Sequence, residues 1–178
     1  MLVGCSLLSG CLGTIEGDPD SAAAIEESGA PTGSDFDRAM MEIASSYESF
    51  SQINSRPYRS SLGESQINLY VLGEVDAYRS IHPEVVAASD KIKVGTVIVR
   101  EVLDAQGAVA KLTLMAKGPK GYDPAIGDWW FGEASPQGVP LVAGDTVRLG
   151  RLTDCHGCHV PRAAEDYLFG VPEAEQDD

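Results

Sequence analysis

An apolar stripe at helical spacing runs through residues 35–53. Its members recur at steps of four, three, four and three: Phe36, Met40, Ile43, Tyr47 and Phe50. This period places all five side chains on one face of an α-helix, where they would pack against the rest of the protein. Ser34 precedes the stripe with a hydroxyl of the kind that caps helix N-termini, and Pro57 follows it. The pattern therefore predicts an amphipathic helix over 35–53.

After Pro57 the hydrophobic pattern takes the shorter period of β-strands. Ile67, Leu69 and Val71 alternate with other residues, as expected when one face of a strand is buried. The segments that we interpret as strands are 66–72, 96–103, 109–117, 128–134 and 146–149. The later connections are short, which favours antiparallel pairing, and 74–90 reads as a short helix and a loop. The predicted fold class is α+β, with the N-terminal helix packed on an antiparallel sheet.

Charge is concentrated at the two ends of the chain. Of 178 residues, 27 are acidic and 13 are Lys or Arg, which gives a formal charge of −14. The segments 12–35 and 163–178 hold 12 of the acidic residues and no basic one, so the central part is nearly neutral. This acidity argues against nucleic acid as a partner, and the chain has no 18-residue apolar run for a transmembrane helix. We expect one domain over 35–172, a flexible acidic tether over 12–34 and an acidic tail over 173–178.

The first residues resemble the signal of a bacterial lipoprotein. Leu8, Ser9 and Gly10 precede Cys11 as in a lipobox, where the cysteine is lipidated and the preceding segment is removed. This interpretation predicts a lipoprotein-type signal over 1–11 and lipidation of Cys11. The protein would then lie on the periplasmic side of a bacterial membrane, held by the lipid alone or soluble in the periplasm. A chance apolar start is the alternative, because the segment is short and has no Lys or Arg.

The strongest chemical signal is the run Cys-His-Gly-Cys-His at residues 155–159. A C-x-x-C-H run is typical of covalent haem attachment, in which both thiols form thioethers and the following histidine ligates iron. Two intervening residues allow one turn of chain to present both sulfurs to the same ring. The sequence therefore predicts one haem c, held by Cys155 and Cys158 and ligated through iron by His159.

Two other chemistries use a pair of cysteines at this spacing. A structural zinc site needs four ligands, and the only other cysteines are Cys5 and Cys11 in the predicted signal. A thiol–disulfide pair normally opens a helix after a strand in a thioredoxin-like unit, and that context is missing here. Haem attachment is the favoured interpretation.

The occupant of the sixth iron position would decide the function. A methionine or histidine there suits electron transfer, an empty position suits binding of a small gas or amine, and a polar base beside an empty position suits redox catalysis. Met115 lies on the otherwise polar face of the 109–117 strand, which is unusual for methionine, and it either packs against the haem or under a loop, or is a distal ligand. His82 and His156 are expected at the surface. The aromatic residues at 129–131 are expected in the core and the wall of a haem pocket.

Beyond the haem motif, the chain resembles the cytochrome P-460 family over residues 35–172. The segments that carry the resemblance are GTVIVRE at 95–101, LTLMAK at 112–117, GDWW at 127–130, CHGCH at 155–159 and DYLF at 166–169. The resemblance implies an N-terminal helix packed with an antiparallel sheet, a haem at the sheet face and often a homodimer. Enzymatic members oxidise hydroxylamine at a five-coordinate haem that is crosslinked to a lysine. The related β-type cytochromes c′ lack the crosslink and bind nitric oxide or carbon monoxide.

The family position of the crosslinking lysine is Arg100 in this chain. Arginine stays protonated and is a poor nucleophile, so hydroxylamine oxidation is the weaker hypothesis. Lys93, Lys111 or Lys117 would have to replace it. Arg100 itself is either a partner of a haem propionate or a charge in the distal pocket, with a catalytic role if the protein is an enzyme, or a solvated residue at a sheet edge.

The leading hypothesis is a mono-haem cytochrome that binds or converts a small nitrogen species, nitric oxide or hydroxylamine, at a five-coordinate haem. Such a protein would exchange electrons with an external partner. A six-coordinate electron-transfer cytochrome is the alternative.

Overall fold

The computed structural model describes residues 33–60, 63, 65–83 and 92–177. The strands are β1 (Ser51–Gln52), β2 (Tyr58–Arg59), β3 (Gln66–Leu72), β4 (Val97–Leu103), β5 (Val109–Lys117), β6 (Trp129–Ala134), β7 (Val142–Ala143), β8 (Thr146–Val147) and β9 (Leu149–Gly150). The α-helices are α1 (Gly33–Ala44), α2 (Val75–Arg79) and α3 (Thr153–His159), and the 3₁₀ turns are η1 (Tyr47–Ser49), η2 (Pro124–Ile126), η3 (Val160–Glu165) and η4 (Glu173–Glu175). The expected signal, Cys11 and the tether as far as residue 32 lie outside the described residues.

A seven-stranded antiparallel sheet forms the centre of the molecule. Its strand order is β1-β3-β4-β5-β6-β9, and β2 pairs with the other end of β3. The strands expected over 66–72 and 109–117 have the same bounds in the structure, and those at 96–103 and 128–134 begin one residue later. The α+β prediction with an antiparallel sheet is thereby confirmed. The 146–149 run is divided between β8, which forms a separate hairpin with β7, and β9.

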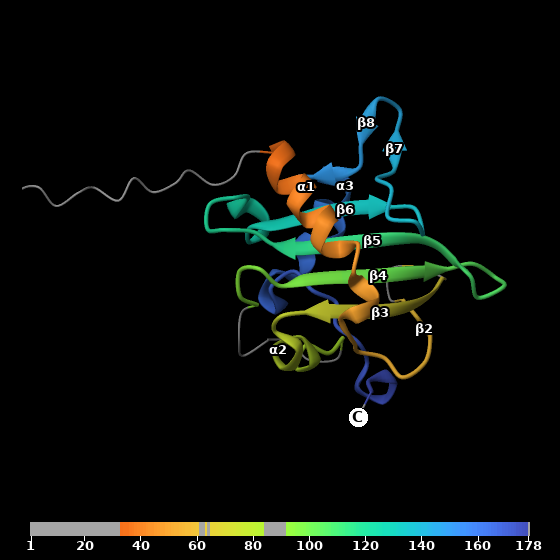
Figure 1. Ribbon diagram of the computed structural model, residues 1–178. Coiled ribbons are helices and arrows are strands. Elements are labelled where there is room, and N and C mark those ends of the chain that lie inside the picture. Colours follow the sequence, from red (N-terminus) through yellow and green to blue (C-terminus); the bar gives the residue numbers. More distant parts are fainter. Residues whose placement is uncertain (1–32, 61–62, 64, 84–91, 178) are drawn as a thin grey trace, which may run out of the picture.

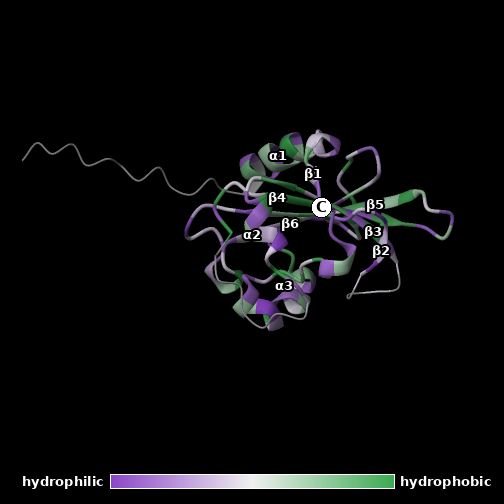
Figure 2. Ribbon diagram, turned by 90° about the horizontal axis from the view of Figure 1, so that it is seen from below, coloured by the Kyte–Doolittle hydropathy of each residue, from purple (hydrophilic) through white to green (hydrophobic). Residues whose placement is uncertain are grey.

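The sheet separates two layers (Figures 1 and 2). α1 lies across one face, and α3 with the segment that directly follows it lies on the opposite face. Alternation along the strands supplies a buried surface to each side: Val99 and Leu114 face the α1 layer, and Leu69 and Ile98 face the α3 layer. Among the described residues, no helix is both long and apolar enough to span a bilayer.

The N-terminal helix is shorter than the sequence indicates, because α1 ends at Ala44 and not at 53. Three serine hydroxyls follow, from Ser45, Ser46 and Ser49, and each donates to the carbonyl three residues before it. Such local bonds compete with helical backbone bonds and favour turns. Tyr47 and Phe50 are still buried against the α1 side of the sheet, although they extend from η1 and the segment after it.

The described part of the acidic tail packs along the folded unit. The Asp177 amide donates to the Ile53 carbonyl at 2.7 Å, and the Gln176 side chain donates to the carbonyls of Arg79 and Val171. Glu175 pairs with Arg56 at 3.1 Å, where the arginine side chain is largely exposed. These contacts hold the C-terminal segment beside β1.

Candidate functional site

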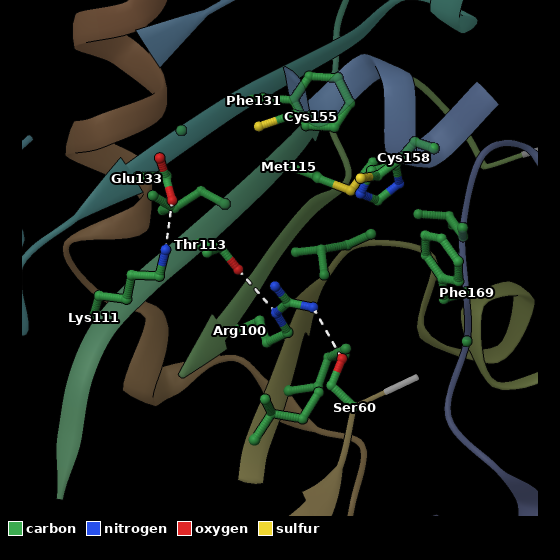
Figure 3. A pocket seen from close by; sticks show the side chains of 18 of the residues that line it. Ser60, Arg100, Lys111, Thr113, Met115, Phe131, Glu133, Cys155, Cys158 and Phe169 are labelled. Atoms are coloured by element: carbon green, nitrogen blue, oxygen red, sulfur yellow. Dashed lines mark hydrogen bonds and ion pairs between the residues drawn. The ribbon is translucent and has the colours of Figure 1, made fainter. Parts of the chain in front are cut away.

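A cavity of about 370 Å³ lies between the sheet and α3. Its walls come from β2, β3, β4, β5 and β6 on one side and from α3 and the segment after η3 on the other (Figure 3). Cavities of this size are typical of small-molecule and cofactor sites. The cavity is therefore the candidate functional site.

Strand register places three polar residues in one row across the cavity face. Arg100 on β4 is opposite Thr113 on β5, which is in turn opposite Glu133 on β6. The next row on this face, two residues along each strand, contains Ile98, Met115 and Phe131. Residues that are far apart in the sequence are brought together here by pairing alone, so the sheet offers a polar row beside an apolar one.

The cysteine motif forms the opposite wall. Cys155, Cys158 and His159 lie on α3 at spacings of three and four residues, which places them on one helix face, and all three line the cavity. Neither cysteine is in a disulfide. Burial raises the pKa of the Cys155 thiol to about 11, so this thiol is protonated at neutral pH. Catalytic thiol–disulfide pairs depend on a lowered thiol pKa, and this environment therefore argues against that alternative.

His159 is held in one orientation. Its Nδ1 donates a hydrogen bond to the Tyr167 carbonyl at 2.6 Å, which leaves Nε2 as the unprotonated nitrogen of the neutral ring. The ring lies between Phe131 and Phe169, with ring centroids at 5.2 and 5.1 Å. Burial lowers the pKa of His159, and the nearby Arg100 charge lowers it further against the raising effect of the Tyr167 bond. A neutral imidazole with Nδ1 occupied has the form that metal-ligating histidines take.

A strained turn presents the Tyr167 carbonyl to His159. Asp166 and Tyr167 have positive φ values of 50° and 66°, a region that non-glycine residues adopt at a cost. The turn is held by a buried ion pair, in which the Lys117 ammonium lies 2.7 and 2.9 Å from the two Asp166 carboxylate oxygens. The Ile92 amide donates to the same carboxylate, and the Trp129 indole donates to the Asp166 carbonyl. The orientation of His159 thus depends on contacts from three other parts of the chain.

Arg100 lies inside the sheet, so the interpretation of it as a solvated sheet-edge residue is wrong. β4 is paired on both sides, by β3 and β5, and the Arg100 side chain lines the cavity. Its Nε donates to Thr113 Oγ1 at 3.0 Å and its Nη1 to Ser60 Oγ at 3.4 Å (Figure 3). Burial lowers the Arg100 pKa, although an arginine remains charged at any ordinary pH.

The other candidates divide between the cavity and the surface around it. Met115 lines the cavity. Of the three lysines proposed to replace the family lysine, only Lys111 lines it. Lys93 pairs with Glu74 at 3.0 Å, and Lys117 is engaged by Asp166.

Neither of the two other histidines lines this cavity. His82 lies within 3.3 Å of the Gln176 side chain, and His156 bonds the Ala125 carbonyl at 3.2 Å. Tyr58 and Tyr78, which no sequence motif indicated, also line the cavity. Phe169, also in its wall, belongs to the DYLF segment of the resemblance and could have been found from it.

Glu133 connects the cavity to a network of charged side chains that no sequence pattern indicated. It accepts from Lys111 and from Arg148, each at 2.7 Å, and Arg148 also pairs with the exposed Asp154. Burial raises the pKa of the Glu133 carboxyl, but the two hydrogen bonds outweigh that effect and hold its pKa below the ordinary value. The charges of Lys111 and Arg148, which both line the cavity, are therefore neutralised by carboxylates.

The Glu133 network predicts an acid-dependent contribution to stability. A carboxyl with a lowered pKa in the folded protein stabilises it above the unfolded pKa, about 4.3, and loses this contribution as the pH falls through the folded value. We expect Glu133→Gln to be less stable than wild type by about 1 kcal/mol at pH 7 in urea unfolding, with a difference that shrinks towards pH 3. Glu173→Gln, a matched change at an exposed residue, should follow wild type throughout. A constant difference across this pH range would contradict the prediction.

Within the described residues, no three His, Cys, Asp or Glu side chains are grouped so that they could hold a metal ion together. A haem iron differs from such a site because it needs only one or two protein ligands. Comparisons with models of known protein families, with curated proteins and with solved structures gave no match to this chain.

Proposed function

We propose that this protein is a mono-haem c-type cytochrome of the cytochrome P-460 type. In this proposal Cys155 and Cys158 bind the haem covalently and His159 ligates its iron. The observation that carries it is the convergence of all three motif residues on one wall of a cavity, with His159 fixed through Nδ1. The family assignment itself rests on the sequence resemblance.

The residues present fit a covalently held haem in three ways. Both thiols are free and face the same cavity as the imidazole. The Tyr167 carbonyl selects the tautomer in which Nε2 can ligate a metal. Apolar and aromatic side chains, among them Ile98, Phe131 and Leu168, supply the surroundings that a porphyrin needs.

When bound there, a haem c supplies an iron that can bind a small nitrogen species such as nitric oxide or hydroxylamine and change its oxidation state. The chain's own residues define the surroundings of that chemistry. Phe131 and Phe169 hold the His159 ring from two sides, and Arg100 places a positive charge in the cavity. Turnover of a nitrogen species would need an external electron-transfer partner.

Hydroxylamine oxidation with a lysine–haem crosslink is a less favoured form of the proposal. Lys111 is the only one of the three alternative lysines that lines the cavity, and its ammonium lies 2.7 Å from Glu133. A protonated amine in an ion pair is a poor nucleophile, because its lone pair is occupied by the proton. This pairing favours a protein without the crosslink, as in the β-type cytochromes c′.

Location outside the cytoplasm, lipidation at Cys11 and possible assembly as a homodimer belong to the same proposal. They rest on the sequence of the first eleven residues and on the resemblance. Mass spectrometry of the exported protein would detect both the lipid on Cys11 and the porphyrin.

Absorption spectra of the matured protein test the proposed function. After expression with a haem-attachment system, we expect a high-spin ferric spectrum and ready binding of nitric oxide. A strongly red-shifted ferrous Soret band with hydroxylamine turnover would instead indicate the crosslinked enzyme. A protein that carries no haem would refute the proposal.

Met115 provides the test of the six-coordinate alternative, because it lines the cavity and methionine is a common axial ligand. If the protein is five-coordinate, Met115→Leu should leave the spectrum unchanged and cost less than about 1.5 kcal/mol of unfolding free energy, since the two side chains have similar volumes. A low-spin wild-type spectrum that becomes high-spin in Met115→Leu would support the electron-transfer cytochrome. Met41→Leu, on α1 in the other layer, is the matched control.

A further inference from the structure

Arg100 differs from the other cations at the cavity in the partners that it has. Lys111 and Arg148 are paired with Glu133, and Arg148 also with Asp154. Arg100 makes no ion pair with any carboxylate of the described residues, and its hydrogen bonds go to the hydroxyls of Thr113 and Ser60. It is thus a positive charge held in place by neutral groups.

The surroundings of Arg100 disfavour its charged guanidinium, because they replace water with buried side chains. Its neighbours along the cavity wall include Tyr58 and Tyr78, which are 7% and 3% exposed, and the buried Ile67 and Leu69. A cation that leaves water for such surroundings loses hydration that two hydroxyl contacts replace only in part. A bound anion would compensate for this lost hydration through its charge and its hydrogen bonds to the guanidinium.

The guanidinium also retains hydrogen-bonding capacity toward the cavity. Thr113 accepts from Nε and Ser60 from Nη1, whereas no described residue accepts from Nη2. Nη2 is not among the sealed, unsatisfied polar atoms of the described residues, which are Arg79 Nε and Arg162 Nη2. The free donors of Arg100 are therefore accessible, and the cavity is the space that its side chain lines.

We propose that Arg100 is the receptor for a small anion inside the cavity, of the class of nitrite, azide or a carboxylate. The inference deepens the proposed function, on which it rests, because the anion would occupy the same cavity as the haem. A planar guanidinium offers paired N–H donors to such an anion, which a lysine cannot reproduce. Anionic ligands would thereby be favoured over neutral ones.

The anion has two possible sources with the same chemistry. It is either a free ligand or a propionate carboxylate of the haem itself. The position of Arg100 favours the free ligand. Its side chain is held inside the cavity by Thr113 and Ser60, whereas the cavity cation beside a strongly exposed side chain is Arg148, which already pairs with Asp154 (65% exposed).

Equilibrium titrations of the holoprotein test the inference. Azide binding to the ferric protein is followed by absorbance in wild type, Arg100→Gln and Arg100→Lys, with carbon monoxide binding to the reduced protein as the neutral control. We expect Arg100→Gln to weaken azide binding by about 10- to 100-fold, as for loss of a charged hydrogen bond, and Arg100→Lys to be intermediate. Carbon monoxide affinity should change by less than about threefold. Arg59→Gln, the same charge change at an exposed residue of β2, controls for the net charge.

Each outcome decides between the sources or overturns the inference. Weaker azide binding in Arg100→Gln alone supports a free anion. Unchanged azide affinity together with a shifted reduction potential assigns the guanidinium to a propionate. If azide affinity and potential are both unchanged, Arg100 is no anion receptor.

Absence of haem would refute the proposed function without deciding this inference. In that case calorimetric titration of the haem-free protein with azide would decide it, since anion binding that is lost in Arg100→Gln would still support the site. Equal heats in the two proteins would overturn it.

Discussion

Replacing both Cys155 and Cys158 by Ala is expected to abolish covalent haem in the exported protein completely. Without either sulfur no thioether can form, so the mature polypeptide should lose the porphyrin mass and give no pyridine haemochrome on the protein after denaturation. The single variants should each retain one bond and lower the yield. These expectations follow from the position of both thiols on the α3 wall of the cavity.

The neighbouring histidines supply a matched pair of controls. His159→Ala removes the proposed iron ligand and should change the spectrum of any haem that is attached. His156→Ala, three positions earlier on the same helix, removes a ring that bonds the Ala125 carbonyl outside the main cavity, and should leave the spectrum unchanged. Wild-type protein without added porphyrin mass, after expression with a haem-attachment system, would contradict the assignment.

Lys117→Met is expected to lower the free energy of unfolding by about 3–5 kcal/mol, because it leaves the Asp166 carboxylate buried without its cation. The Lys117 and Asp166 side chains are only 10% and 5% exposed. Urea unfolding of the same preparation gives the measurement. Lys93→Met is the matched control: its ammonium also pairs with a carboxylate, but the side chain is 76% exposed, and its loss should cost no more than about 1 kcal/mol.

The double variant separates the ion pair from general packing. Lys117→Met combined with Asp166→Asn removes both charges, so it should recover part of the stability that Lys117→Met loses. The same substitutions should also move the Tyr167 carbonyl, which accepts the hydrogen bond of His159, because the Asp166–Tyr167 turn positions it. We therefore expect the reduction potential of the holoprotein to shift. A Lys117→Met protein within 1 kcal/mol of wild type would show that the pair contributes little.

Much of the fold could be predicted from local pattern, because alternation identifies a strand with one buried face. β3 and β5 have the predicted bounds for this reason. The predicted end of α1 was wrong. The apolar stripe continues past Ala44, but from there serine hydroxyls donate hydrogen bonds to the backbone carbonyls of the last helical turn, and the helix ends. The sequence indicated a strand over 146–149, but not β7 or its separate hairpin with β8, because Val142 and Val147 are exposed and show no alternation with buried residues.

Single residues of the candidate site, among them Arg100, Lys111 and Met115, could be indicated from the sequence, but a group of site residues was predictable only where its members are adjacent in the chain. Cys155, Cys158 and His159 form a local motif, so the sequence alone indicated them. The row of Arg100, Thr113 and Glu133 depends on the register of three strands, which no single segment reveals. The Asp166–Tyr167 turn likewise depends on distant partners, because isolated non-glycine residues do not favour positive φ.

The placement of α3 has a consequence for how the protein could mature. None of its seven residues is buried, and it takes no part in strand pairing, so moving it aside would uncover the apolar cavity wall, Ile98 and Phe131 included, without breaking any hydrogen bond of the sheet. An enzyme that installs a prosthetic group on this helix would therefore need only a local opening. The rest of the architecture can stay assembled while the covalent bonds are made.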